Sequence, residues 1–458
     1  MRVSARPQAF DPCIISVCLR VTSEETDRKS IGEEEEMKNI ADRIWKGLRW
    51  RIRLIPGIRQ IHRVINRRKR DKLLWEKIPA IYKEHSGKPV DEKKVIFAEV
   101  HGTKLSENFR LLYDDLKASG SFDIHVHYLR YFEAEGSEYR QNSCRLAEDM
   151  ADAKYIFVND ACPIVGAVSM RPETIVTQMW HGCGAFKKFG ESTAEKKFGE
   201  SDRTRERHPV RNYDNLDYVT VSSPEVVWAY EEAMGLKGKD TKVLGIGLSR
   251  TDVFFHQEFV ERARRKVREA FPASAGKKLL LYAPTFRGRV GRAVTPDYKQ
   301  FDLEKLHEEL GDEYSVIIKL HPFIKPARVP QIPKDLKGTF AIDATQSLTI
   351  SELLCAADVC VSDYSSLIFE YSLFGKPMLF YAYDLKNYFD WRGFYYNYDQ
   401  LTPGPVCDMM DMLIDELKHL DERFDPEVVS RFRDKFMKSC DGHATERIEQ
   451  LVFGRTYS

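Results

Sequence analysis

The chain has 458 residues, of which 43% are hydrophobic and 31% are charged, a composition that is typical of folded globular proteins and excludes disordered and fibrous classes. This length exceeds what one hydrophobic core commonly supports, so we expect two or three domains. The formal net charge of +1 gives no overall signal for nucleic acid, and any electrostatic signal must come from a local cluster.

Nine cysteines are spread along the chain without a Cys-x-x-Cys pair, which argues against a disulfide framework and against a zinc site. No apolar run approaches the roughly 18 to 20 residues that cross a bilayer. The apolar patch at Cys13–Leu19 lacks the basic start and the cleavage site of a signal peptide. We therefore expect a cytoplasmic protein.

Residues 1–42 are predicted to be poorly structured, and an acidic run at residues 33–36 directly precedes Met37. Two explanations remain open. Met37 is the native start, preceded by codons that resemble a purine-rich ribosome-binding site, or the segment is a short disordered acidic tail. Intact-mass analysis of protein from the native host distinguishes the two.

Residues 43–92 form a basic segment, because residues 43–72 hold twelve Lys or Arg against one acidic residue, Asp71. Apolar residues recur there at helical spacing, Pro56-Gly57 divides the stretch into two helices, and residues 73–75 prolong the apolar face. The segment is predicted to lie on an anionic membrane surface. The alternative is that the apolar stripe packs on the following domain while the arginines face solvent.

Short β-rich runs alternate with helical stretches from Lys93 onward, which predicts parallel sheets. Five runs fall within 93–248 and five within 249–458, so we expect two α/β domains with these boundaries. The runs are residues 94–100, 123–128, 155–158, 174–179, 218–222, 278–282, 315–320, 340–342, 358–361 and 377–381. Ligands in such sheets lie beyond the carboxyl ends of the strands.

The segment Ser362-Asp-Tyr-Ser-Ser366 closes an apolar strand and opens a helix that ends at Gly375. The hydroxyls of Ser365 and Ser366, beside the free N–H groups of the helix start, predict a pyrophosphate site. The alternative is that these serines only cap the helix.

Two histidines, His181 and His321, stand at corresponding strand ends, and imidazole suits proton transfer near neutral pH. Thr285 and Arg287 follow another strand, where Arg287 is predicted to clamp phosphate or else to pair with a carboxylate. Lys187 and Lys188 are either acceptor-phosphate contacts or solvated charges.

Four motifs occur in a fixed order: Gln178-Met-Trp-His-Gly182, Tyr282-Ala-Pro-Thr-Phe-Arg287, Lys319-Leu-His-Pro322 and Ser362-Asp-Tyr-Ser-Ser366. Together with Gly375-Lys-Pro377, Phe380-Tyr-Ala-Tyr-Asp384, Arg392-Gly-Phe394, Pro403-Gly-Pro405 and Asp441-Gly442, they make residues 93–455 resemble the CDP-glycerol glycerophosphotransferase family. The resemblance implies a GT-B architecture, in which two Rossmann-like domains face a cleft.

The resemblance also implies a reaction: an acceptor hydroxyl on a membrane-linked polymer attacks CDP-glycerol, releases CMP and extends a teichoic acid or similar polymer. It implies that His181 is the general base and that His321, Arg287 and the Ser365/Ser366 turn hold the pyrophosphate. Further residues are implied at the donor or acceptor: Thr285, Ser362, Asp363, Tyr364, Glu370, Gly182, Lys187, Lys188 and Arg392. No metal ligands and no cofactor are assigned. The expected location is the inner face of the bacterial cell membrane.

Residues 182–187 depart from the usual family pattern, and Gly288-Arg289 replaces residues that are commonly acidic. The choice between glycerol and ribitol phosphate, and between a primase and a polymerase, therefore stays open. A GT-B glycosyltransferase that uses a nucleotide sugar is one alternative, and an inactive membrane adaptor is another.

Overall fold

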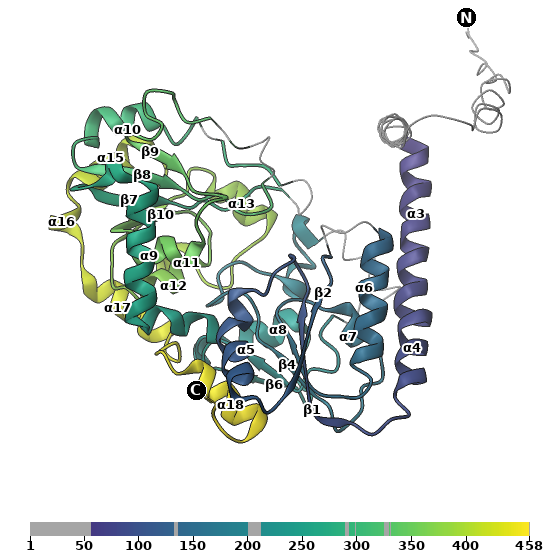
Figure 1. The fold of residues 1–458 in the computed structure, drawn as a ribbon. Coiled ribbons are helices and arrows are strands. Elements are labelled where there is room, and N and C mark those ends of the chain that lie inside the picture. The colour runs from purple at the N-terminus through teal and green to yellow at the C-terminus, as the bar shows by residue number, and fades with distance from the viewer. Residues whose placement is uncertain are drawn as a thin grey trace, which may run out of the picture. The chain divides into compact units, whose positions relative to one another are not determined.

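The computed structural model describes residues 56–131, 136–199, 212–288, 293–297, 299–324, 329 and 331–457, with side chains from Val64 onward. The predictions for residues 1–42 and for the first basic helix lie outside these residues. The described residues from Leu73 onward form one compact unit, and helix α3 belongs to another (Figure 1). Among the described residues, no helix combines the length and apolar character that a membrane span requires.

Helix α3, Pro56–Lys72, begins at the predicted break, with Pro56 at its first position. Its last turn carries Lys69, Arg70 and Lys72, and Val64 and Ile65 keep 46% and 44% of their surface exposed. The described part of this helix is therefore basic, with apolar side chains that face solvent.

The residues after α3 correct the predicted extent of the membrane segment. A π-helical turn, Leu73–Lys77, and helix α4, Ile78–His85, belong to the main unit. Leu73 and Leu74 are buried in its core, so the apolar face that they prolong packs inward as in the alternative interpretation.

The first sheet has six parallel strands in the order β2-β1-β3-β4-β5-β6. The strands are β1 Asp91–Glu99, β2 Asp123–Tyr128, β3 Ala153–Val158, β4 Ile175–Gln178, β5 Tyr218–Thr220 and β6 Lys242–Leu244. The helices are α5 Glu107–Ser119, α6 Gly136–Asp149, α7 Pro163–Gly166 and α8 Val227–Met234. Successive residues of β1 supply opposite faces: Ile96 packs in one buried cluster and Phe97 in another, as the two-residue period of a strand requires.

The second sheet also has six parallel strands, in the order β12-β11-β10-β7-β8-β9. The strands are β7 Lys278–Tyr282, β8 Tyr314–Ile318, β9 Ala341–Asp343, β10 Val359–Ser362, β11 Met378–Tyr381 and β12 Val406–Cys407. The helices are α9 Gln257–Ala270, α10 Leu303–Leu310, α11 Ile350–Ala356, α12 Leu367–Ser372, α13 Leu385–Trp391, α14 Tyr398–Leu401, α15 Met410–Lys418, α16 Leu420–Arg423 and α17 Pro426–Phe436. Two parallel-sheet α/β domains are thus confirmed.

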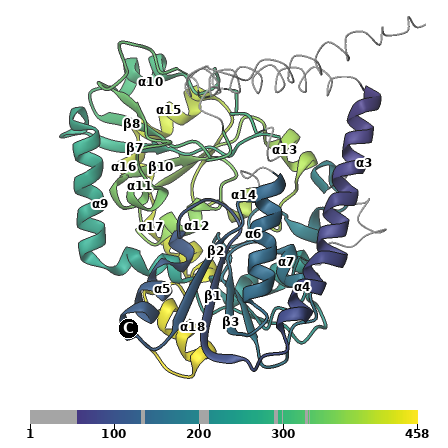
Figure 2. The same ribbon diagram turned by 45° about the vertical axis from the view of Figure 1, so that its right-hand side comes forward.

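Helix α18, Ala444–Phe453, packs on the first sheet. The predicted boundary had placed these residues in the second domain. Ile448 and Val452 of α18 share a buried cluster with Phe97 of β1 and Phe109 of α5. The domain of the first sheet therefore contains residues from both ends of the described chain, and Figure 2 shows α18 beside α5 and β1.

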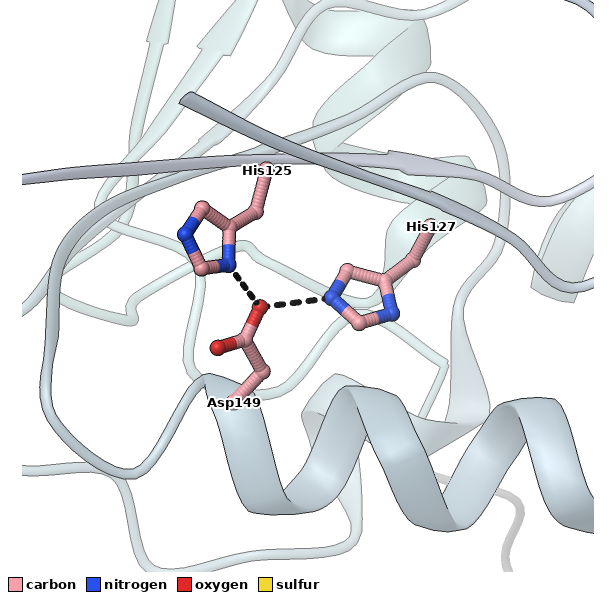
Figure 3. A group of neighbouring side chains, drawn as sticks. All are labelled: His125, His127 and Asp149. Carbon is pink, nitrogen blue, oxygen red and sulfur yellow. Dashed lines mark hydrogen bonds and ion pairs between the residues drawn. The ribbon is translucent and has the colours of Figure 1, made fainter. Parts of the chain in front are cut away.

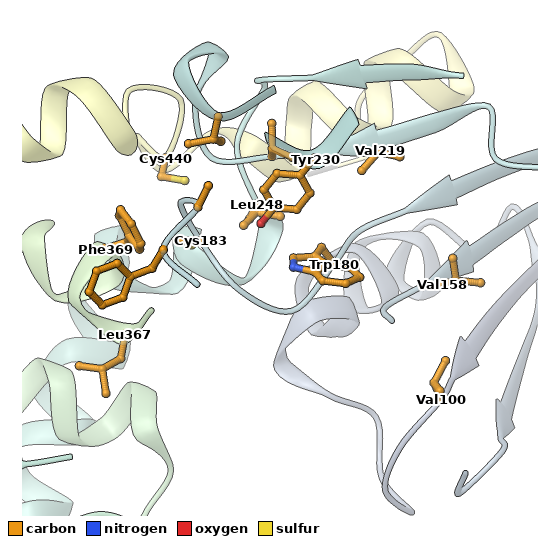
Figure 4. Packing of buried hydrophobic residues seen from close by; sticks show 14 of the residues in the cluster. Val100, Val158, Trp180, Cys183, Val219, Tyr230, Leu248, Leu367, Phe369 and Cys440 are labelled. Atoms are coloured by element: carbon orange, nitrogen blue, oxygen red, sulfur yellow. The ribbon is translucent and has the colours of Figure 1, made fainter. Parts of the chain in front are cut away.

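The two sheets are joined by a continuous apolar cluster that includes Trp180, Cys183, Phe369 and Cys440 (Figure 4). Gly184 has a φ of +63°, and a Cβ at this position would lie 2.3 Å from the Phe369 ring. Only glycine combines this left-handed backbone with so close a contact. The cluster therefore fixes the loop after His181 against α12 of the other domain.

Candidate active site

The carboxyl end of the first sheet carries a chain of three polar side chains. His101 follows β1, Asp160 follows β3 and His181 follows β4. Asp160 Oδ2 lies 3.1 Å from His101 Nε2 and 3.4 Å from His181 Nδ1. Burial raises the pKa of Asp160, but the neighbouring His181 and His101 outweigh this and lower it overall. Asp160 is thus an anion that can orient both rings.

The His181 side chain keeps 47% of its surface exposed, while its Nδ1 faces the protein. Nδ1 lies 3.3 Å from the carbonyl oxygen of Asn159, which can only accept a hydrogen bond. The neutral ring therefore carries its proton on Nδ1 and presents the lone pair of Nε2. The ring also stacks on Trp180 with centroids 4.5 Å apart, and Trp180 has a φ of +53°, so the turn itself is held in a rare conformation.

His321 follows β8 and has the opposite tautomer. The backbone N–H of Phe323 donates to His321 Nδ1 at 3.2 Å, so the neutral ring carries its proton on Nε2. Burial, together with the positive charges of Lys187, His181 and Arg392, lowers the pKa of His321 to about 3. In this structure His321 is a neutral hydrogen-bond donor.

Lys187 lies between the two domains, because it forms an antiparallel bridge with Phe394. Burial and the nearby charges of Arg392 and Arg287 lower its pKa to about 7, although Asp363 raises it. Lys187 and His181 of the first domain both lie close enough to His321 of the second domain to lower its pKa.

Arg287 pairs with carboxylates, which is the second of the two roles that the sequence left open for it. Its Nε and Nη2 donate to Asp384 at 2.7 and 2.8 Å, and Nη1 donates to Asp363 at 2.9 Å. Its guanidinium also lies 5.1 Å from the ring centres of Tyr364 and Tyr388. This corrects the prediction of a phosphate clamp, because two carboxylates already engage the guanidinium edges that would bind phosphate.

Four residues predicted at the donor are structural instead. Ser362 donates to the carbonyl oxygen of Ala283, and Asp363 accepts from the N–H groups of Thr285 and Tyr364. Tyr364 is fully buried and donates to Asp384, which corrects its expected place at the donor. Glu370 is buried against Arg250, which gives the same correction. Thr285 is also buried, and its hydroxyl finds no hydrogen-bond partner among the described residues.

Ser365 and Ser366 remain partly exposed at the start of α12. Ser366 Oγ lies 3.5 Å from the position that a Cβ on Gly182 would occupy, so the serine turn of one domain meets the His181 loop of the other. Ser365 Oγ makes only a long contact of 3.5 Å with the N–H of Leu367. The Ser366 hydroxyl therefore lies beside the His181 loop.

Arg392 and Lys188 hold the Lys187 loop. Arg392 Nε donates to the carbonyl oxygen of Lys188 at 2.9 Å, and Lys188 N donates to the carbonyl oxygen of Gly393 at 3.0 Å. The guanidinium of Arg392 also stacks on Phe198 at 4.3 Å. Arg392 thus positions the loop, and its charge reaches His321 and Lys187.

The structure adds three residues that the sequence analysis missed. Asp160 and His101 follow strands that were predicted, so the same strand-end rule that selected His181 could have found them. Arg250, just after the first domain, donates from Nη1 to the carbonyl oxygen of His181 at 2.9 Å and lies 2.9 Å from Glu370 through Nε. No local pattern indicated this pairing.

Comparison with known proteins identifies relatives. The sequence profile of the family described as CDP-Glycerol:Poly(glycerophosphate) glycerophosphotransferase matches residues 80–454. The chain is 33% identical over 368 residues to the teichoic acid ribitol-phosphate primase of Bacillus spizizenii, covering 80% of this chain and 92% of the relative. It is 33% identical over 371 residues to the teichoic acid poly(ribitol-phosphate) polymerase of the same organism, covering 80% of this chain but only 57% of that longer protein.

The fold has a solved counterpart in the wall teichoic acid polymerase TagF. The TM-score is 0.65, with 23% identity over 87% of this chain and 96% of that one. At this identity the likeness concerns the fold, and it agrees with the GT-B arrangement of two Rossmann-like domains.

Proposed function

Because the chain belongs to the CDP-glycerol:poly(glycerophosphate) glycerophosphotransferase family, we propose that it transfers a polyol phosphate from a CDP-polyol to a hydroxyl of a lipid-linked acceptor. The product is a longer teichoic acid or similar polymer, and CMP is released. The observation that supports this most strongly is the pair of strand-end histidines with opposite tautomers, which supplies one proton acceptor and one hydrogen-bond donor.

His181 is the proposed general base. Its Nε2 lone pair takes the proton of the acceptor hydroxyl while that oxygen forms a bond to the β-phosphorus of the donor. The bond from that phosphorus to the bridging oxygen breaks, and CMP leaves with the electron pair. Asp160 stabilises the imidazolium that forms, because its carboxylate lies 3.4 Å from Nδ1.

His321, Lys187 and the Ser365/Ser366 hydroxyls are the proposed pyrophosphate contacts. The Nε2–H of His321 can donate to a phosphate oxygen while the ring itself is neutral. An arriving pyrophosphate favours the protonated form of Lys187, so binding itself restores the positive charge that burial disfavours. These donors offset the charge that develops on the leaving CMP.

The donor polyol is tested directly by enzyme assay. Both relatives compared above are named for ribitol phosphate, whereas the family description names glycerol phosphate. Purified protein is incubated with membranes and with CDP-ribitol, CDP-glycerol or a UDP-sugar, and nucleotide release is measured. CMP release from a CDP-polyol supports the proposal. UDP release alone favours a glycosyltransferase, and no release with any donor favours an inactive adaptor.

The catalytic histidines are tested in the same assay. We expect His181→Ala and His321→Ala each to lower turnover by about 100-fold or more with the fold retained, which is the usual scale for a lost acid-base group. His419→Ala, which changes a partly exposed histidine at the end of α15, is the matched control and should keep parental activity. Activity above a tenth of the parent in either site variant contradicts its role.

We also propose that residues 43–72 bind the anionic membrane surface where a lipid-linked acceptor is found. Each Lys or Arg near such a surface contributes about 1 kcal/mol at low salt. Because Leu73 and Leu74 belong to the core, the deletion must end at residue 72. Full-length protein should float with phosphatidylserine vesicles and release as salt rises, whereas the deletion should not float. Equal flotation of both proteins contradicts the proposal.

A further inference from the structure

A second cluster of titratable side chains lies away from the candidate active site, on the edge strand β2 and helix α6 (Figure 3). His125 and His127 are two residues apart on β2, so both project from the same face of the strand. Asp149 closes α6, and Figures 1 and 2 show this helix beside β2. The proposed ligand atoms of the three side chains lie within 4.8 Å of one another.

We propose that His125 Nδ1, His127 Nε2 and Asp149 Oδ2 bind a divalent transition metal such as Zn²⁺, with water in the fourth position. Two imidazole nitrogens and one carboxylate oxygen are a ligand set that suits zinc. The site would cross-link the edge strand to the helix that covers it. The absence of a Cys-x-x-Cys pair has no bearing on a His-x-His pair on a strand.

The observed distances are compatible with binding after a small movement. Asp149 Oδ2 lies 2.7 Å from His125 Nδ1 and 2.7 Å from His127 Nε2. Ligand atoms around tetrahedral zinc are about 3.3 Å apart, given metal–ligand bonds of about 2.0–2.2 Å. The nitrogen and oxygen atoms must therefore separate by about 0.6 Å, which side-chain rotation can supply.

Two nearby carboxylates, Asp123 and Asp152, can keep the ligand atoms of His125 and Asp149 available to a metal. Asp123 Oδ2 lies 3.1 Å from His125 Nε2, so it can accept that N–H and leave Nδ1 for a metal. Carboxylates that fix the free nitrogen of a metal-bound histidine are common at zinc sites. Lys94 Nζ contacts the other oxygen, Asp149 Oδ1, at 2.6 Å and also Asp152 Oδ1 at 2.6 Å, so Asp152 can retain the lysine charge when a metal binds.

Protons compete with a metal for this site. Burial lowers the pKa of His125, but Asp149 and Asp123 outweigh it and raise the pKa overall. Asp123 and Asp149 contact the histidines, and Lys94 pairs with Asp149 and Asp152 behind them. Because the ligating nitrogens must be free of protons, metal binding should weaken as the pH falls.

Metal analysis of the full-length protein tests this site. Protein stripped with EDTA is incubated with ZnSO₄, passed over a desalting column and analysed for bound zinc, and Co²⁺ absorption reports tetrahedral coordination. We expect one equivalent in the parent, loss in His127→Gln and in Asp149→Asn, and an affinity about tenfold lower in Asp123→Asn. Circular dichroism checks that each variant is folded.

Two controls locate the metal. His85→Gln changes a histidine of α4 that lies 3.4 Å from Glu148, the neighbour of Asp149 on α6, and it should keep one equivalent. His181→Ala should also keep it. The proposal is overturned if the parent retains no zinc, if a folded His127→Gln protein binds as the parent does, or if the zinc is lost in His181→Ala and therefore lies at the other site.

Discussion

Arg250 carries the strongest prediction about stability, because it links the His181 loop to the second domain. Its guanidinium and the Glu370 carboxylate keep only 11% and 6% of their side-chain surface exposed. They lie at an ion-pair distance of 2.9 Å, although without the alignment of a hydrogen bond. Removing one partner of a buried pair leaves the other charge uncompensated, at a cost of about 3–5 kcal/mol. We expect Arg250→Met to lower the free energy of unfolding by this amount near pH 8.

The cost should be smaller at pH 5. Burial raises the pKa of Glu370 above its usual value, and Arg250 counteracts this shift. Without Arg250 the pKa rises further, so the folded state holds the proton to higher pH than the unfolded chain does. Such a group contributes stability below its unfolded pKa and loses that contribution as pH rises through its folded pKa. The deficit of the variant therefore grows from pH 5 to pH 8.

Urea unfolding at both pH values measures the effect, with the slope m checked for a change of mechanism. The double variant Arg250→Met/Glu370→Leu should recover most of the loss, because neither charge remains buried. Glu107→Gln is the control: Glu107 lies 3.5 Å from Arg250 and is 39% exposed, so it should cost about 1 kcal/mol or less. A loss below about 1 kcal/mol in Arg250→Met, or a double variant no more stable than the single one, refutes the reasoning.

Two further predictions concern the active site. Because the pKa of Lys187 is about 7, kcat/KM for the donor should fall as pH rises through 7. The variant Lys187→Arg stays charged and should remove that fall. A pH profile of the variant that is identical to that of the parent contradicts the role of Lys187. The unfolded chain binds this proton more tightly, so the same lysine makes the protein more stable as pH rises from about 7 toward 10.5. Asp160→Asn should lower kcat about 10- to 1000-fold with little change in donor KM, since Asp160 positions His181 and is not proposed to touch phosphate; a raised KM with unchanged kcat would assign it to binding instead.

The sequence predicted the fold because short apolar runs, from residues 340–342 to residues 94–100 in length, mark buried parallel strands. The two strands that were not predicted are β6, Lys242–Leu244, and β12, Val406–Cys407, with three and two residues. Helical spacing identified the apolar stripe that includes Leu73 and Leu74, but spacing does not show which surface a stripe meets. The packing of Leu73 and Leu74 in the core shows that their part of the stripe meets the main unit.

The strand-end rule selected His181 and His321, and the structure brings the two side chains close enough for His181 to lower the pKa of His321. The rule could not separate ligand contacts from internal pairs. The guanidinium of Arg287 has the donors that a phosphate clamp needs. It pairs instead with Asp384, 97 residues along the chain, whose carboxylate oxygens accept the hydrogen bonds that phosphate oxygens would accept. The tautomers of the two histidines depend on two backbone groups, the carbonyl oxygen of Asn159 and the N–H of Phe323. Because side-chain identity does not distinguish such groups, the sequence could not predict the tautomers.

The return of α18 to the first sheet has a consequence for synthesis on the ribosome. Strand β1 is synthesised long before Ile448 and Val452 of α18, which cover its Phe97 face. At about 5–20 residues per second, roughly 20–70 s separate the two events. During that interval the face stays incompletely covered, so the nascent chain exposes an apolar surface of the kind that chaperones bind. A stop codon before residue 444 would leave it exposed permanently.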